Sequence, residues 1–166
     1  MQFYMALGVD EQTKSKLAPY ANGNSNNLHM TLYRNTKRKS LNYFFDITIP
    51  LDKRVTIGPD YNVVVFRKSC PFLVLIPQKV SEYYELKKNV KKNFSKYLEG
   101  VLQEEILSYC MDSLPYLLSG NRNRTPHVTL RKNFNKSNLS SFRKKFLSSQ
   151  MSSENLYFDK LKVVLR

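Results

Sequence analysis

The sequence lacks tryptophan and contains only two histidines, two cysteines and five glycines. Cys70 and Cys110 show no C-x-x-C spacing and have no histidine nearby, so the sequence predicts neither a zinc site nor a redox-active pair. No apolar run approaches the length of a membrane span, and the first residues lack the basic segment that begins a signal peptide. We therefore expect a cytoplasmic protein with no metal, no cofactor and no membrane contact.

Acidic residues are also scarce. The chain has 13 Asp and Glu against 27 Lys and Arg, a formal net charge of +14. Such an excess favours polyanionic partners such as nucleic acids or nucleotides, although lysines that only keep a surface soluble would give the same count. A length of 166 residues suits one domain, residues 1–166, which we expect to be a monomer.

Hydrophobic periodicity predicts a mixture of strands and helices. Alternating apolar residues indicate strands, and apolar residues at three- and four-residue steps indicate helices. The expected strands are 2–9, 28–33, 42–49, 53–57, 61–66, 71–76, 124–130 and 156–166. The expected helices are 11–17, introduced by Asp10 as a cap, then 80–101, 104–118 and 138–150.

Both halves of the chain present similar parts in a similar order. The simplest architecture is α+β: a bilobal, pseudo-twofold duplication in which each lobe is a small antiparallel β-sheet with helices outside. An active-site cleft is expected between the lobes.

The two histidines occupy the same local pattern, His-x-Thr-Leu-x-[Arg/Lys]-Asn, once in each half. Residues i and i+2 of a strand point to the same face, so His29 shares a face with Thr31, and His127 shares one with Thr129. Pairing of the lobes would bring two imidazoles and two hydroxyls together.

This quartet suits chemistry on a phosphate ester. A neutral imidazole can take a proton from the attacking oxygen, and a protonated imidazole can give one to the leaving oxygen. Threonine hydroxyls can hydrogen-bond to the phosphoryl oxygens. A single H-x-T is most often a structural histidine beside a strand threonine, but two copies that use both histidines favour catalysis. The pattern leaves open which histidine is the acid.

The segments "LHMTL" and "PHVTL", each on an expected strand, resemble the paired H-x-[S/T] motifs of the 2H phosphoesterase superfamily. The resemblance covers most of the chain. It implies a bilobal fold, metal-independent hydrolysis of 2′,3′-cyclic phosphates or 2′-5′ phosphodiesters, and a catalytic set of His29, Thr31, His127 and Thr129. The chain departs from the family pattern after each motif, at Tyr33–Asn35 and at Lys132.

Basic and aromatic residues flank both motifs and are candidates for holding substrate. Cations could bind the phosphates of an oligonucleotide, and tyrosines could stack on bases. The candidates are Arg34, Arg122, Arg124, Arg131, Lys132, Tyr4 and Tyr33. For most of them taken singly, a solvated loop or core packing is the alternative.

Three substrates fit the expected phosphodiesterase: RNA ends with a 2′,3′-cyclic phosphate, 2′-5′ linked oligoadenylate, and cyclic oligonucleotide signals. Some viral and phage members of the superfamily degrade the latter two to blunt host immunity, and a lysine-rich chain is compatible with such an origin. One alternative is a non-catalytic RNA-binding or nucleotide-sequestering protein. Another is a structural protein whose basic surface docks on an acidic partner.

Overall fold

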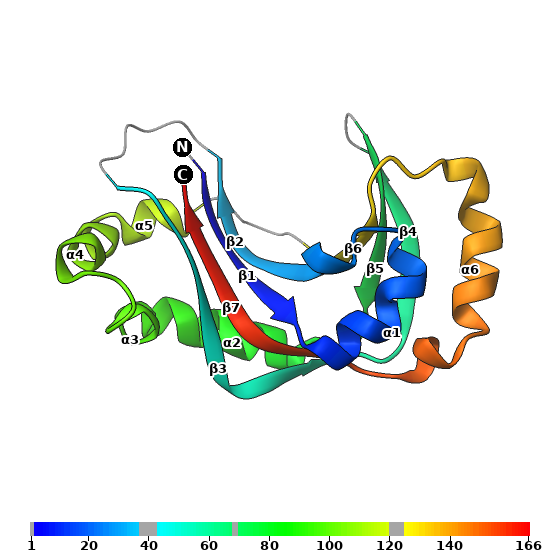
Figure 1. Ribbon diagram of the computed structural model, residues 1–166, viewed down its shortest axis with the longest axis horizontal. Helices are drawn as coiled ribbons and strands as arrows, with labels where there is room; N and C mark the ends of the chain where they lie inside the picture. The colour runs from blue at the N-terminus through cyan, green and yellow to red at the C-terminus, as the bar shows by residue number, and fades with distance from the viewer. Residues whose placement is uncertain (1, 37–42, 68–69, 120–124) are drawn as a thin grey trace.

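The structure is a computed structural model that describes residues 2–36, 43–67, 70–119 and 125–166. Within these residues the chain forms a mixed α+β fold, with seven strands in one antiparallel sheet and six α-helices (Figure 1). The strands are β1 (Phe3–Val9), β2 (His29–Asn35), β3 (Phe45–Ile57), β4 (Tyr61–Arg67), β5 (Pro71–Pro77), β6 (Val128–Arg131) and β7 (Leu156–Leu165). The helices are α1 (Glu11–Ala21), α2 (Ser81–Lys92), α3 (Phe94–Leu98), α4 (Glu104–Asp112), α5 (Leu114–Leu117) and α6 (Leu139–Leu147).

The α+β class, the antiparallel strands and most expected elements are confirmed. The side chain of Asp10 accepts a hydrogen bond from the backbone N–H of Thr13 at 2.7 Å, as expected of a helix cap. The expected strands 42–49 and 53–57 are wrong as separate elements, because β3 runs through both as one long strand. Its pairing with β7 shifts register between Pro50 and Val55.

Two expected helices are each divided in two. The amphipathic pattern from Val80 is interrupted at Asn93, whose side-chain amide donates to the side-chain oxygen of Asn89 at 2.9 Å. Asparagine has a low helix propensity, and the backbone angles of Asn93, φ −122° and ψ 37°, lie outside the helical range. The segment 104–118 breaks at Ser113, two residues before Pro115, because proline disrupts the interior of a helix.

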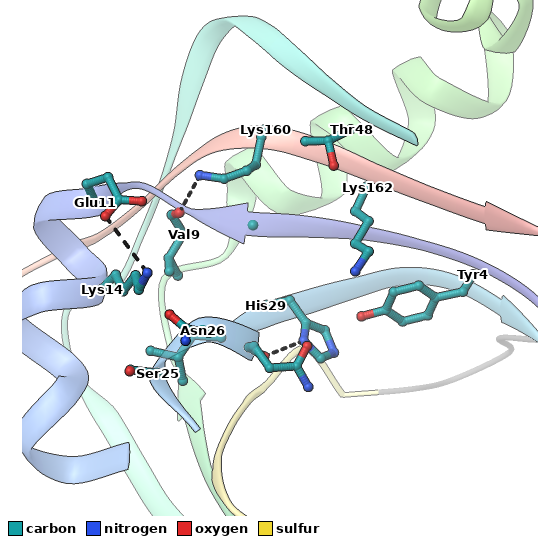
Figure 2. Close-up of a pocket in the computed structure, with 13 residues that line it drawn as sticks. Tyr4, Val9, Glu11, Lys14, Ser25, Asn26, His29, Thr48, Lys160 and Lys162 are labelled. Carbon is teal, nitrogen blue, oxygen red and sulfur yellow. Dashed lines mark hydrogen bonds and ion pairs between the residues drawn. The ribbon is translucent and has the colours of Figure 1, made fainter. Parts of the chain in front are cut away.

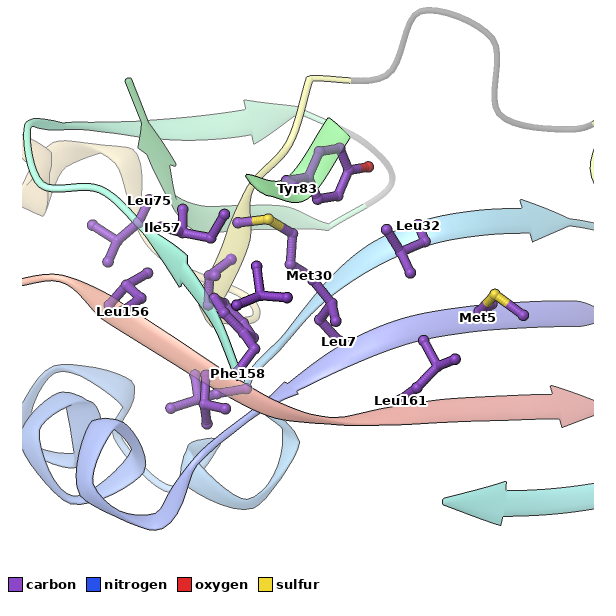
Figure 3. Packing of buried hydrophobic residues seen from close by; sticks show 14 of the residues in the cluster. Met5, Leu7, Met30, Leu32, Ile57, Leu75, Tyr83, Leu156, Phe158 and Leu161 are labelled. Atoms are coloured by element: carbon purple, nitrogen blue, oxygen red, sulfur yellow. The ribbon is translucent and has the colours of Figure 1, made fainter. Parts of the chain in front are cut away.

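The strand order is β3-β7-β1-β2-β6-β5-β4. The sheet is therefore continuous, but β2 and β6 at its centre are paired at one position only, Met30 with Val128. Both side chains are completely buried and belong to one extended hydrophobic cluster (Figure 3). Within the described residues, no helix is both long enough and apolar enough to cross a membrane.

Helix α2 is fixed to β2 by two tyrosine hydroxyls. Tyr83 on α2 donates to the carbonyl oxygen of Thr31 at 2.8 Å, and Tyr33 on β2 donates to the carbonyl oxygen of Lys87 at 2.9 Å. Tyr83 is 1% exposed and belongs to the same hydrophobic cluster as Met30. These bonds join the helix to the strand that carries His29.

A β-bulge explains why Tyr33 does not follow the alternation of His29 and Thr31. Along β1, Ala6 pairs with Thr31 but Met5 pairs with Tyr33, so Leu32 is an extra residue in β2. After the extra residue, the side chains alternate in the opposite sense. Tyr33 therefore points into the core, where it is 5% exposed, and Arg34 lies on the same face as His29. The expectation that Tyr33 stacks on a substrate base is therefore wrong.

Replacement of Tyr33 by phenylalanine tests this structural role. We expect Y33F to lower the free energy of unfolding by about 1 kcal/mol, because the Lys87 carbonyl loses its buried hydrogen-bond donor. Urea unfolding of the two proteins measures the difference. If Y33F were as stable as the wild type but bound nucleotides more weakly, Tyr33 would be a ligand contact instead.

Candidate active site

The pairing of Met30 with Val128 places the two histidine motifs face to face. Each residue is the middle one of its H-x-T triplet. Because β2 and β6 run antiparallel, the next pairs along the strands bring His29 opposite Thr129 and Thr31 opposite His127. An antiparallel pair has a local twofold axis, so the two triplets are symmetric copies about this point.

The four side chains line one pocket with a volume of about 220 Å³. None of the described residues that line it is acidic. The lining residues are Tyr4, Asn24, Asn27, His29, Thr31, Arg34, Phe66, Phe72, His127, Thr129 and Lys132. We call this space the histidine pocket. Its polar groups are two imidazoles, hydroxyl and amide groups and two cations, which suits an anionic ligand.

Both imidazoles are oriented in the same way. Nδ1 of His29 lies 2.7 Å from the carbonyl oxygen of Asn27, and Nδ1 of His127 lies 2.9 Å from that of Thr125. A carbonyl can only accept, so each ring donates its Nδ1–H and, when neutral, carries its lone pair on Nε2. Each motif thus binds the carbonyl two residues before its histidine and presents Nε2 for proton transfer.

An aromatic ring packs edge-to-face against each imidazole. The rings of Tyr4 and His29 are 5.4 Å apart at their centroids, and those of Phe66 and His127 are 4.9 Å apart. Tyr4 therefore lines the pocket as expected of a candidate residue. Its observed contact is with His29, which it helps to orient.

Burial lowers the pKa of His29 below its usual value of 6.5, because desolvation disfavours the imidazolium. The hydrogen bond to Asn27 opposes this shift, and the positive groups of His127, Lys162 and Lys132 add to it. His29 is thus biased toward the neutral form that accepts a proton.

Of the candidate cations, Arg34 and Lys132 line the histidine pocket, because each follows a β-bulge. β6 has a bulge at the same motif position as β2: Thr129 pairs with Val74 but Arg131 pairs with Leu73, so Leu130 is the extra residue. Arg34 and Lys132 occupy equivalent motif positions, and both line the histidine pocket. Nε of Arg34 is buried and has no hydrogen-bond partner among the described residues.

Arg131 lies outside the histidine pocket. Its Nε donates to the carbonyl oxygen of Tyr20 at 2.8 Å, and its guanidinium lies 5.1 Å from the ring centroid of Phe142. These contacts join β6 to α1 and α6. Arg131 lines a different pocket, together with Asn24 and Lys132, and its expected role in substrate binding stays a prediction. Arg122 and Arg124, the two other candidate arginines, lie outside the described residues.

Four residues of the pocket were not expected from the sequence. Asn24 donates from its amide to the carbonyl oxygens of Thr129 and Leu130 at 3.3 and 3.4 Å. Asn27 supplies the carbonyl that holds His29. Phe66 and Phe72 face each other across the β4–β5 pair and line the pocket on the side of His127. Only the "NGNSNN" cluster before the first motif gave any signal, and it indicated a turn.

No protein-family model matches the chain, and no curated protein matches it. Among the described residues, no three His, Cys, Asp or Glu side chains are grouped as metal ligands would be. The chemistry of the site is therefore inferred from its own geometry.

The lowered pKa of His29 predicts a pH dependence of stability. Between that lowered pKa and 6.5, unfolded chains bind more protons at this position than folded ones. The free energy of unfolding contributed by His29 therefore rises with pH through this window and levels off above about 6.5. Urea unfolding at several pH values, with H29Q as the reference that removes this titration, measures the effect. A wild-type minus H29Q difference that is flat with pH, or that falls as pH rises, would contradict the assignment.

Proposed function

We propose that this protein is a phosphodiesterase that cleaves RNA-type phosphodiesters in the histidine pocket. The observation that carries the proposal is the antiparallel pairing at Met30 and Val128, which sets two imidazoles and two threonines around one cation-lined space. Both imidazoles donate Nδ1–H to a backbone carbonyl, and this leaves both Nε2 atoms in the role of proton acceptor or donor.

His29 is the general base in the proposed mechanism. Its burial and the neighbouring positive groups favour the neutral ring. Nε2 of His29 takes a proton from the attacking hydroxyl or water as the new O–P bond forms. His127 enters the reaction protonated and gives its Nε2 proton to the leaving oxygen as the old P–O bond breaks. Proton transfers in the two directions balance, and the imidazoles return to their starting states after proton exchange with solvent.

The remaining groups stabilise charge on the phosphoryl oxygens. Thr31 and Thr129 offer hydroxyl donors, one beside each histidine. Arg34 and Lys132 bring positive charge from equivalent places in the two motifs, since both side chains line the histidine pocket. Because cations and hydroxyls surround the phosphate, the proposed mechanism is metal-independent.

We also propose that the sheet is a duplication of two lobes that meet between β2 and β6, with the histidine pocket as the cleft between them. Three repeated features support this: the carbonyl bond of each imidazole, the aromatic ring beside it, and the bulge at the leucine after each threonine. This arrangement is the one that the resemblance to 2H phosphoesterases implies.

A substrate panel tests the proposed function. The panel, in EDTA, contains adenosine 2′,3′-cyclic monophosphate, an ApA dinucleotide ending in a 2′,3′-cyclic phosphate, 2′-5′ linked diadenosine with and without a 5′-phosphate, and several cyclic di- and trinucleotides. We expect turnover of at least one class, and loss of turnover in H29A and H127A of at least about a hundredfold, because each removes one proton-transfer step. Mass spectrometry identifies the products.

The same panel separates catalysis from sequestration. R143Q is a matched control, because Arg143 lies on α6, outside the residues lining the histidine pocket, and donates to the carbonyl oxygen of Val63. Retention of activity in R143Q with its loss in both histidine variants supports the assignment. Tight binding without turnover by the wild type, and equal binding by H29A and H127A, would instead indicate a nucleotide-sequestering protein.

The pH dependence of the rate provides an independent test. A neutral base and a protonated acid together predict a bell-shaped profile of kcat/KM with two limbs that belong to the histidine pair. The acidic limb should lie below 6.5, since burial lowers the pKa of His29. A rate that changes in one direction only between pH 4 and 9 would be inconsistent with two histidines acting in opposite protonation states.

A further inference from the structure

A second pocket adjoins the histidine pocket on the same face of the sheet. It has a volume of about 220 Å³ and shares Tyr4, Asn27 and His29 with the first (Figure 2). Its other lining residues are Gly8, Val9, Glu11, Lys14, Ser25, Asn26, Leu28, Thr48, Lys160 and Lys162. We call it the lysine pocket. A ligand held by His29 can therefore extend into it without leaving the protein surface.

The strand register fixes the separation of the two pockets. Ala6 on β1 pairs with Thr31 on one side and with Lys162 of β7 on the other. Lys162 thus lies two strands from Thr31, which is about 10 Å across the sheet. Two residues further along β1, Gly8 pairs with His29 of β2 on one side and with Lys160 of β7 on the other. The two pockets are therefore centred over different strands of the sheet, and two phosphates of an oligonucleotide can occupy both.

Two small residues of β1, Ala6 and Gly8, lie between the histidine motif and the lysines, and Ala6 is completely buried. At these two positions β1 therefore places no long side chain. Gly8 is required for a further reason: a Cβ at this position would lie 2.7 Å from Cγ of Lys160, whose side chain crosses the glycine. The Lys160 amino group then donates to the carbonyl oxygen of Val9 at 2.8 Å.

The charges of the lysine pocket are not balanced by its acids. Lys160 is paired with Asp159 at 2.8 Å, and Lys14 lies 4.0 Å from Glu11. Lys162, by contrast, has no carboxylate within ion-pair distance in the described parts of the chain. Figure 2 shows its amino group directed toward Tyr4 and His29, two of the residues that both pockets share. A cation in this place, close to a phosphodiester site, is suited to bind a second phosphate.

We propose that the lysine pocket is a subsite for a second phosphate, with Lys162 as its main contact and Lys160 as a weaker one. The substrate is then an oligonucleotide with at least two phosphates, rather than a mononucleoside cyclic phosphate. This inference rests on the proposed function, since it takes the first phosphate to be the one cleaved in the histidine pocket.

Matched substrates and lysine variants test the subsite. Each pair in the panel compares a substrate with one phosphate and a substrate with two. In the first pair these are adenosine 2′,3′-cyclic monophosphate and the ApA dinucleotide that ends in a 2′,3′-cyclic phosphate. In the second pair they are 2′-5′ linked diadenosine without a 5′-phosphate and the same compound with one. For the linkage that is cleaved, we expect kcat/KM to be several-fold higher for the two-phosphate member. K162Q should bring this ratio close to one, and K160Q should lower it less, because Lys160 is already paired with Asp159.

Salt dependence gives a second readout that does not require a matched pair. For the best substrate of the panel, K162Q should reduce the slope of log KM against log salt concentration by about one. K88Q removes the same charge from the exposed side of α2, which packs on the opposite face of the sheet, and should leave both the ratio and the slope unchanged. Lys162 is exposed, so K162Q should fold, and its urea unfolding curve verifies this.

The outcomes distinguish the subsite from the proposed function. The subsite is supported if K162Q, but not K88Q, brings the ratio of kcat/KM values close to one and reduces the salt dependence of KM. Turnover with the same ratio and slope in wild type and K162Q overturns the subsite alone. Turnover of no panel member by the wild type overturns the proposed function and the subsite with it.

Discussion

The candidate site depends on a single strand pairing, that of β2 with β6 at Met30 and Val128. A shift of one residue in this register would place the two histidines on opposite faces of the sheet, since side chains alternate between the faces of a strand. The register is held because Met30 and Val128 are fully buried. Two further bonds reinforce it, from Asn24 to the backbone of β6 and from Tyr83 to the backbone of β2.

Around this pairing the protein repeats one local design. Each histidine donates to the carbonyl two residues earlier, and each is followed by a bulged leucine that returns a cation to the pocket. The two copies differ in what surrounds them. Lys162 lies near His29, and Tyr4 packs on that ring, whereas Phe66 packs on His127. In the proposed mechanism, such differences allow two histidines in equivalent positions to take the opposite roles of base and acid.

Part of this site could be predicted from the sequence because it follows from strand geometry alone. The alternation in "LHMTL" and "PHVTL" predicts that each histidine shares a face with its threonine, and the pocket contains all four residues. The pattern could not predict the bulge at Leu32, which turns Tyr33 into the core. Bulges depend on pairing with β1, which lies outside the local sequence.

Non-local contacts account for the other differences. The role of Arg131 is set by the backbone of α1, and the contact of Phe66 with His127 is set by the β4–β5 hairpin; neither leaves a local signal. The break at Asn93 is the exception, because asparagine is a poor helix former. The apolar period continues across Asn93, and for this reason the pattern predicts one helix.

The most direct test of the account uses the fact that the chain has only two histidines. Imidazole resonances in a ¹H–¹⁵N correlation spectrum can be assigned with H29Q, and adenosine 2′-monophosphate, a product-like ligand, can be titrated into the wild type. If the two motifs form one phosphate site, both histidines will shift along a single binding curve with one Kd. A shift of only one histidine, or of both with different Kd values, would show that the motifs do not act on the same phosphate.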